Sequence, residues 1–375
     1  MYTENEIVSI ARRENNNKRK YLVVNRLQGK HIPVIPSEAL DMFQELGKLI
    51  QKEYQGERLL IIGFAETATA IGASLAIQTD SPYIQTTRER EEGVTYLYFT
   101  ESHSHAEEQK LVRDDIASVI KNINRIIFAE DEITTGNTIL KIVNILKREF
   151  PEQIKFSAAS ILNGMNHEAE KIYAEQQIRL HYLIKTNHES YTDIAEQYRG
   201  DGIRRKFILQ SEEQKTDGGF MEFWAEGYEN ARRLVTGRSY RAACERLWKQ
   251  IKSEYGYHSG DKTDILVLGT EEFMYPALYV AAQLENMGNN VRYHATTRSP
   301  IEVSCEENYP LHERFELRSL YDKDRVTYIY ELKKYSEVLV ITDAVSEQSE
   351  GISSLVNALK EKGNMKIHIV RWCKA

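Results

Sequence analysis

Short apolar segments that end in glycine or in acidic residues recur along this chain, each followed by small residues and a helical pattern. LLIIG at 59–63 and RIIFA at 125–129 are two of them, and neither alternates apolar with polar positions. Continuous apolar strands are typical of parallel sheets that helices cover on both faces. The repeated order of strand, loop and helix therefore predicts an α/β fold with a mostly parallel sheet.

The same pattern divides the chain into two α/β parts. Two more strands follow the second apolar segment, and the pattern resumes near residue 264 after a polar stretch that glycines punctuate. Such a stretch is typical of a connecting segment. We predict a polar N-terminal arm over 1–20, one α/β domain over 21–190, a connector with helices over 191–240, and a second, related α/β domain over 241–375.

Three landmarks occur twice in the same order, with nearly equal spacing. Gly63 ends an apolar strand, TTR stands at 86–88, and Asp131 ends another strand. The counterparts in the second half are Gly269, TTR at 296–298 and Asp343. The repetition suggests an internal duplication. Glycine after a strand and aspartate at a strand end are also common in unrelated α/β folds, so two independent halves stay an alternative.

Composition narrows the class of protein. The chain has 375 residues, with 49 Lys and Arg against 56 Asp and Glu, and a formal charge of −7. This balance argues against a protein that mainly binds a nucleic-acid backbone. No stretch approaches the roughly 18 consecutive apolar residues of a transmembrane helix, and the polar N-terminus has no apolar signal core. Three widely separated cysteines predict reduced thiols in a cytoplasmic protein.

The segment 126–138, IIFAEDEITTGNT, carries the most informative chemistry. Glu130 and Asp131 come at the carboxyl end of a buried strand, where open α/β sheets bind ligands. The turn 134–138 then offers hydroxyls and backbone N–H groups at a helix N-terminus, which suits a phosphate monoester, and Gly136 allows close approach of the backbone. Two carboxylates suit the two hydroxyls of a sugar, so the segment predicts a ribose 5-phosphate site.

This segment resembles the phosphoribosyl-pyrophosphate motif of type I phosphoribosyltransferases, which has an apolar strand, two acids and a Thr-Gly-x-Thr turn. The resemblance implies phosphoribosyl pyrophosphate as donor and Mg²⁺, held through Glu130 and Asp131. It also implies an earlier loop that cradles pyrophosphate and a hood loop that closes over it. The 5-phosphate residues would be Thr134, Thr135, Gly136, Asn137 and Thr138. The pyrophosphate residues would be Ala65, Glu66, Thr67, Ala68 and Arg90, with Arg88 as a catalytic cation.

Two features of these loops need explanation. Glu66 would repel pyrophosphate unless Mg²⁺ lies between them or the side chain turns away. His103 and His105, in the hood, point the same way if the chain is extended. They are candidates for catalytic or anion contacts, with metal binding or an exposed loop as alternatives.

A narrower resemblance covers nearly the whole chain. GKHIPV at 29–34, GFAETATAIG at 63–72, ESHSHA at 101–106 and TTRSP at 296–300 are similar to the orotate-phosphoribosyltransferase-like proteins of tellurium-resistance-associated gene clusters. Those proteins carry a C-terminal domain named after its TRSP tetrapeptide. The resemblance implies synthesis of a nucleoside-like metabolite.

The expected reaction is displacement of pyrophosphate from carbon 1 of the ribose by a ring nitrogen. The loop has Thr134 and Thr135 where purine-salvage relatives often have an aspartate that handles the proton of the base. Hydroxyls are poor bases at pH 7. We therefore expect an acidic, orotate-like acceptor, or proton transfer to His103 or His105. We also expect a homodimer.

Alternatives remain at this point. A sensor of phosphoribosyl pyrophosphate or of a nucleotide could use the same residues, and so could an enzyme that splits a nucleotide with pyrophosphate. In the second half, Glu347 and Glu350 lie where a phosphate would sit, so this half is not expected to bind a 5-phosphate. It could bind another ligand, complete the first site or form a dimer contact, and Arg298 could simply form an ion pair. The candidate residues of this second site are Thr296, Thr297, Arg298, Ser299 and Asp343.

Overall fold

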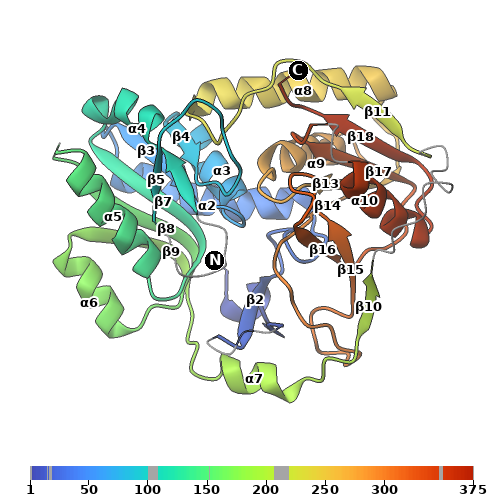
Figure 1. Cartoon of the computed structure of the whole chain (residues 1–375), viewed down its shortest axis with the longest axis horizontal. Helices are drawn as coiled ribbons and strands as arrows, with labels where there is room; N and C mark the ends of the chain where they lie inside the picture. The colour runs from blue at the N-terminus through green and yellow to red at the C-terminus, as the bar shows by residue number, and fades with distance from the viewer. Residues whose placement is uncertain are drawn as a thin grey trace.

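Two open sheets lie side by side, one in each half of the chain (Figure 1). The computed structural model describes residues 2–14, 16, 19–99, 109–151, 153–206, 219–345 and 349–374. None of the helices in these ranges is long and apolar enough to cross a membrane. The predicted α/β fold with mostly parallel sheets is confirmed.

The N-terminal half is built on a six-stranded sheet. In spatial order its strands are β12 (Val235–Thr236), β4 (Pro82–Gln85), β3 (Leu59–Gly63), β7 (Arg125–Ile133), β8 (Lys155–Asn163) and β9 (Ile178–Lys185). All neighbours are parallel except β12, which runs antiparallel to β4. Every residue of β3 is buried, which explains why its sequence does not alternate.

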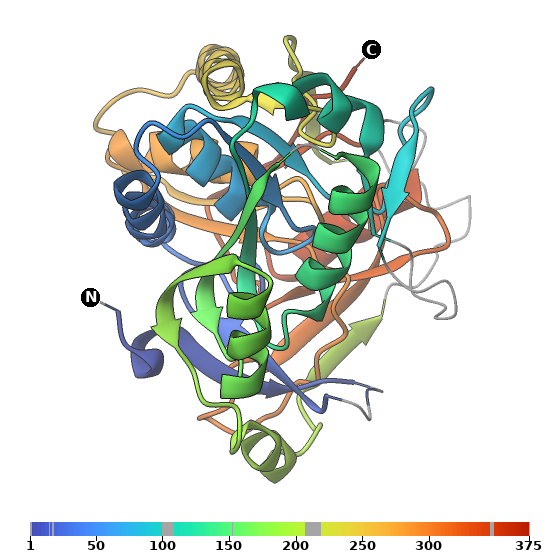
Figure 2. The same cartoon turned by 90° about the vertical axis from the view of Figure 1, so that its left-hand side faces the viewer.

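Helices cover both faces of this sheet (Figure 2). One face carries α2 (Pro36–Glu53) and α3 (Thr69–Thr79), and the other carries α5 (Asn137–Glu149) and α6 (His167–Glu175). Gly72 lets α3 lie directly against β3, because an added Cβ at this position would come within 2.8 Å of the Gly63 Cα. The close packing fixes where the loop between β3 and α3 lies.

The C-terminal half is built on a five-stranded parallel sheet. Its strands, in spatial order, are β11 (Met221–Trp224), β18 (Ile367–Arg371), β17 (Glu337–Thr342), β13 (Asp264–Gly269) and β14 (Asn290–Ala295). Strands β14, β13, β17 and β18 therefore follow the same spatial order as β4, β3, β7 and β8. This is the order that a duplication predicts, although the edge strand β11 comes from earlier in the chain. The duplication itself stays a prediction.

The two halves share an apolar core. Ile61 in β3, Leu46 in α2 and Val267 in β13 belong to one cluster of buried residues. Helix α8 (Gly237–Tyr255) runs across the top of Figure 1 and packs on α3, and α9 (Tyr275–Asn286) packs on both α2 and α3. The loops at the carboxyl ends of β3 and β13 are held face to face as a result.

The N-terminal arm and the connector both add strands that the sequence pattern did not predict. After α1 (Glu4–Ile7), β1 (Val8–Arg12) pairs with β2 (Tyr21–Asn25) in a hairpin that lies between the halves in Figure 1. After α7 (Tyr191–Gln197), the connector strand β10 (Ile203–Lys206) pairs with β15 (Glu313–Arg318), which pairs with β16 (Val326–Tyr330). The remaining elements are β5 (Tyr96–Tyr98), β6 (Lys110–Val112), α4 (Arg113–Val119), the 3₁₀ turn Ile120–Asn122 and α10 (Ser349–Glu361).

Candidate functional site

The predicted acid pair lies at the switch point of the first sheet. From β3 the chain continues to β4 on one side, whereas β7 lies on the other side of β3, and open α/β sheets bind ligands in the crevice that this arrangement leaves. Pairing between β3 and β7 ends at Gly63 and Ala129, so Glu130 and Asp131 extend past the end of β3. Thr67, in the loop after β3, donates a hydrogen bond across the crevice to Asp131 Oδ1 at 2.9 Å.

Both acids are easier to protonate than usual. Burial, followed by the neighbouring carboxylate of Glu132, raises the pKa of Asp131 to about 6, although the Thr67 hydrogen bond opposes this. Burial and the charge of Asp131 raise the pKa of Glu130 well above its ordinary value. The negative charges of the ionised acids are not balanced by nearby positive charge, so a cation or hydroxyl donors beside this pair would stabilise them.

The acid pair suits Mg²⁺ that is bound partly by the protein and partly by a substrate. Among the described residues no group of three or more His, Cys, Asp or Glu side chains could form a closed metal site. Mg²⁺ commonly uses one or two carboxylates, keeps several waters and takes its other ligands from substrate phosphates. Glu130 and Asp131 fit an ion bound in this manner together with a diphosphate substrate.

The predicted phosphate turn begins α5. Gly136 has a φ of +71°, and a Cβ there would come within 2.4 Å of the Tyr173 hydroxyl, which donates to the Gly136 carbonyl at 2.7 Å. The first turn of α5 holds no acidic residue, so its N–H groups keep their attraction for an anion. A cavity of about 910 Å³ opens beside the turn and is lined in part by Thr134, Thr135 and Asn137. Thr138 is exposed on the same turn.

The loop after β3 has two free backbone donors rather than four. Ala65 N–H donates to Thr86 Oγ1 at 2.8 Å, and Ala68 N–H donates to the Phe64 carbonyl at 2.9 Å. The N–H groups of Glu66 and Thr67 have no acceptor within the described part of the chain. Of the four residues predicted to bind pyrophosphate through N–H groups, only these two keep that group available.

The Glu66 side chain turns away into a buried ion pair. Lys30 Nζ lies 2.6 Å from Glu66 Oε1, and Arg298 Nε lies 3.3 Å from Oε2. These two cations outweigh the effect of burial and lower the pKa of Glu66 to about 2. The expected repulsion between this carboxylate and pyrophosphate is therefore removed by two residues of other segments, Lys30 in GKHIPV and Arg298 in TTRSP.

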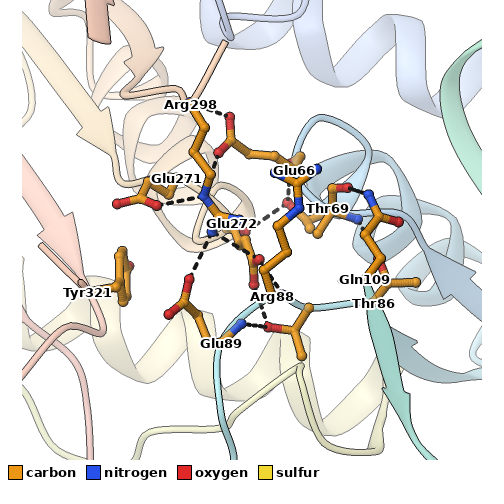
Figure 3. Close-up of polar contacts among 12 residues, drawn as sticks. Glu66, Thr69, Thr86, Arg88, Glu89, Gln109, Glu271, Glu272, Arg298 and Tyr321 are labelled. Carbon is orange, nitrogen blue, oxygen red and sulfur yellow. Dashed lines mark hydrogen bonds and ion pairs between the residues drawn. The ribbon is translucent and has the colours of Figure 1, made fainter. Parts of the chain in front are cut away.

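Arg88 extends toward this loop from the segment after β4. Figure 3 shows its side chain directed at the loop that carries Glu66, beside Thr69 at the start of α3. Its Nε is buried without a hydrogen-bond partner among the described residues. Arg90 is exposed and lines, with Arg88 and Lys110, a cavity of about 870 Å³ between the halves. His103 and His105 lie outside the described residues.

The N-terminal hairpin brings basic residues to the acid pair, which sequence reasoning missed. Arg19 Nη2 contacts both oxygens of Glu132, at 2.6 and 2.8 Å, and His188 Nε2 lies 3.5 Å from the same carboxylate. Burial, and then the nearby charge of Arg19, lower the pKa of Arg13, whereas Glu132 and Asp131 oppose this shift. Arg13 Nε has no hydrogen-bond partner among the described residues. The signals in the sequence were the basic tripeptides ARR at 11–13 and KRK at 18–20.

Side chains of the protein contact the polar groups of the predicted second site, although Asp343 also lines the cavity between the halves. Asp343 accepts hydrogen bonds from Tyr228 at 2.8 Å and Tyr321 at 2.6 Å, and it pairs with Arg232. Arg298 contacts four carboxylates, those of Glu66, Glu89, Glu271 and Glu272. Thr296 Oγ1 accepts a hydrogen bond from the Glu271 N–H in the loop after β13, and Ser299 N–H donates to Thr297 Oγ1 within its own loop.

Two family models match the chain. Residues 7–191 match a phosphoribosyl transferase family, and residues 233–359 match the TRSP domain that follows this transferase at its C terminus. Comparison with curated proteins found no significant match.

Among solved structures, the chain is similar to several purine phosphoribosyltransferases at low identity. Adenine phosphoribosyltransferase from Rhodothermus marinus is 14% identical, with 48% of this chain and 96% of that chain covered and a TM-score of 0.34. The Trypanosoma brucei adenine enzyme, in complex with AMP, pyrophosphate and ribose 5-phosphate, is 15% identical, with coverage of 48% and 76% and a TM-score of 0.35. Hypoxanthine phosphoribosyltransferase from Staphylococcus aureus is 17% identical, with coverage of 43% and 78% and a TM-score of 0.26.

Proposed function

Because the chain belongs to the family of phosphoribosyl transferases that a TRSP domain follows, we propose that it transfers ribose 5-phosphate from phosphoribosyl pyrophosphate to a ring nitrogen of an acidic, orotate-like acceptor. The hydrogen bond from Thr67 to Asp131 carries this proposal. It joins the loop that would hold pyrophosphate to the acids that would hold the ribose hydroxyls. The phosphate turn at the start of α5 follows on the same strand.

Each end of the donor has a matching group in this crevice. The turn 134–138 binds the 5-phosphate through the N–H groups at the start of α5. Glu130 and Asp131 accept hydrogen bonds from the ribose hydroxyls. The N–H groups of Glu66 and Thr67 face the pyrophosphate. Arg88, whose side chain is directed at the same loop, approaches it from the segment after β4.

The chemistry is a displacement at carbon 1 of the ribose. The acceptor nitrogen forms a bond to this carbon while the bond to the pyrophosphate oxygen breaks, and pyrophosphate leaves with the electron pair. Positive charge develops on the sugar and negative charge on the leaving group, so catalysis relies on positioning and on charge stabilisation. Bound Mg²⁺, held by Glu130 and Asp131, would supply further charge neutralisation. Arg88 stabilises the charge on the departing pyrophosphate.

An acidic acceptor agrees with the basic groups around the crevice. Arg13 has a guanidinium within electrostatic range of Asp131, and its Nε has no hydrogen-bond partner among the described residues. An anionic group on the acceptor would compensate this charge. The turn 134–138 contains no carboxylate or histidine that could remove a proton. An acceptor that ionises in water at neutral pH does not need such a group.

A non-catalytic sensor is the alternative that Glu66 would favour, because a carboxylate beside pyrophosphate would repel it. Lys30 and Arg298 neutralise this side chain and hold it away. A sensor with the same fold therefore becomes an outcome of the test rather than a second proposal.

We propose that the product is a nucleoside-like metabolite made in the cytoplasm, in keeping with the resemblance to proteins of tellurium-resistance-associated clusters. All three cysteines are free thiols, as in reducing compartments.

The test is pyrophosphate release from labelled phosphoribosyl pyrophosphate with a panel of bases, including orotate, uracil, adenine and hypoxanthine. Release that depends on an acidic base supports the proposal. Tight binding of the donor without release in the presence of any base would instead support the sensor.

A further inference from the structure

The two TTR tripeptides contact glutamates of the opposite half through the same atoms. Thr87 Oγ1 donates to Glu272 Oε2 at 2.7 Å, and Arg88 N–H donates to Glu272 Oε1 at 2.9 Å. In the reverse direction, Thr297 Oγ1 and Arg298 N–H donate to Glu66 Oε1 at 2.8 and 3.2 Å. Reciprocal contacts of this kind are those that a two-fold axis creates between identical subunits.

The supports of these contacts are also equivalent. In the N-terminal half, Thr86 N–H donates to the Gly63 carbonyl at 2.9 Å, and Thr86 Oγ1 accepts from the loop after β3. In the C-terminal half, Thr296 N–H donates to the Gly269 carbonyl at 3.1 Å, and its Oγ1 accepts from the loop after β13. Each loop therefore holds its own TTR tripeptide, and each tripeptide holds the glutamate of the other loop.

The two arginines differ in what their guanidinium groups contact. The Arg298 guanidinium forms ion pairs with the carboxylates around it (Figure 3). Its Nε lies 2.7 Å from Glu271 Oε2, and its Nη2 lies 3.0 Å from Glu272 Oε1. The Arg88 side chain forms no ion pair or hydrogen bond with any described residue. The Arg88 guanidinium in the N-terminal half can thus pair with a ligand, whereas the equivalent guanidinium of Arg298 is paired with carboxylates of the protein.

We propose that the C-terminal half acts as a built-in partner subunit, in which Glu272 is a positioning residue that holds the backbone of Arg88 so that its guanidinium faces the pyrophosphate loop. This inference rests on the proposed function, in which Arg88 stabilises the leaving pyrophosphate. Glu272 itself is buried at the interface, and it acts only through the Thr87 and Arg88 donors.

The charge of Glu272 is maintained by its surroundings. Arg298 Nη2 lies 3.0 Å from one oxygen and Arg232 Nε lies 3.3 Å from the other. These cations lower the pKa of Glu272 to about 2 in spite of burial. The carboxylate therefore stays ionised, and hydrogen bonds to an ionised acceptor are stronger than those to a neutral one.

The chain offers a matched control for Glu272→Gln. Glu337 is a buried carboxylate of the same half, and hydrogen bonds from His368, Lys366 and Tyr257 outweigh burial so that its pKa is also lowered to about 2. These partners lie away from both TTR tripeptides. Glu337→Gln should leave kcat and the KM for the donor within about twofold, while Glu272→Gln should lower kcat about 10- to 100-fold.

A double-mutant cycle separates positioning from general damage. Arg88→Ala removes the guanidinium but keeps the N–H that contacts Glu272. If Glu272 acts through Arg88, adding Glu272→Gln to Arg88→Ala should change kcat by less than about twofold. If the Glu272→Gln variant does not fold, Thr87→Val can take its place in the cycle, because it removes one donor to Glu272 and keeps the volume of the side chain. A full additional loss of kcat on the Arg88→Ala background would overturn the proposal, and so would equal kcat values for Glu272→Gln and Glu337→Gln.

Amide hydrogen exchange separates this proposal from the proposed function. Glu272→Gln should speed exchange in residues 87–91 at least about tenfold relative to Glu337→Gln, because local opening becomes easier, whether or not the protein turns over a base. If exchange in residues 87–91 is the same in both variants, Glu272 does not restrain this segment, and the proposal is overturned. A wild-type protein that shows no base-dependent release of pyrophosphate ends the proposed function, and the positioning role with it, even if exchange responds.

Discussion

Thr67 donates a hydrogen bond of 2.9 Å to Asp131 and so joins the loop after β3 to the acid pair on β7. Asp131 is part of β7, and Thr67 follows the neighbouring parallel strand β3, so the carboxyl ends of these two strands meet at one edge of the sheet. A ligand that extends from the loop to the acids would bridge the same gap. Any change at Thr67 should therefore affect both ends of this ligand.

Replacing Thr67 with valine tests this link. Loss of the hydroxyl removes a hydrogen bond that lowers the pKa of Asp131, so the pKa should rise further above 6. We expect kcat/KM for the donor to fall about 10- to 100-fold at pH 7. The acid limb of its pH profile should move to higher pH. Thr79→Val, which removes a hydroxyl that bonds at the end of α3, is the control and should leave the profile in place.

The pH dependence of the wild-type protein follows from Asp131. Its pKa of about 6 predicts that kcat/KM at limiting Mg²⁺ rises with pH, with its midpoint near 6, and then levels off. The reason is that the carboxylate must be ionised to hold hydroxyls or the ion. Saturating Mg²⁺ favours the ionised form and should shift the midpoint to lower pH. A flat profile between pH 5 and 7 would contradict a role for Asp131.

Stability without ligand should change with pH in the opposite sense. The folded pKa of Asp131 is raised above its ordinary value of 3.8, so the folded state binds the proton more tightly than the unfolded chain. The contribution of this group to the free energy of unfolding is fully present below pH 3.8 and is lost as the pH rises through about 6. Asp131→Asn should remove this part of the pH dependence in denaturant titrations.

Gly136→Ala should impair the phosphate turn. Its φ of +71° and the approach of a Cβ to within 2.4–2.6 Å of Tyr173 atoms combine strain with a clash. We expect a loss of about 2–3 kcal/mol in the free energy of unfolding, together with a higher KM for the donor. Gly56→Ala is the matched control, since its φ of +83° is strained but nothing lies within 4 Å. Equal losses in the two variants would show that the Tyr173 contact has no part in the turn.

Arg13→Ala tests the acidic acceptor. Loss of this guanidinium should raise the KM for an acidic base about 10- to 100-fold and leave the KM for the donor nearly unchanged. The side chain of Arg12, the exposed neighbour on the hairpin, donates only a long 3.5 Å hydrogen bond, to the Tyr198 carbonyl, among the described residues, so Arg12→Ala is the control. A higher KM for the donor with an unchanged KM for the base would contradict this role and would place Arg13 beside the pyrophosphate.

The sequence was most informative where the chemistry is local. The acid pair and the turn 134–138 lie within one strand, loop and helix, and their order alone places them at the carboxyl edge of the sheet. The buried strands at 59–63 and 125–129 could be predicted for the same reason, because their apolar character is continuous.

Contacts between distant segments could not be predicted. Glu66 looked unfavourable beside pyrophosphate because the cations that neutralise it, Lys30 and Arg298, come from a preceding loop and from the other half. Strands β10 and β11 escaped prediction because they are short and largely exposed. They exist because β15 and β18 offer them an edge.

The central claim is tested most directly by base-dependent release of pyrophosphate from labelled phosphoribosyl pyrophosphate, measured for the wild type and for Asp131→Asn. Asp115, whose carboxylate contacts Arg233 and the Leu234 N–H rather than the acid pair or the loop after β3, provides the control Asp115→Asn. We expect release by the wild type and by Asp115→Asn with an acidic base, and a loss of at least about 100-fold in Asp131→Asn, with the fold retained by circular dichroism. Near wild-type release by Asp131→Asn, or no release by the wild type with any base, would contradict this claim.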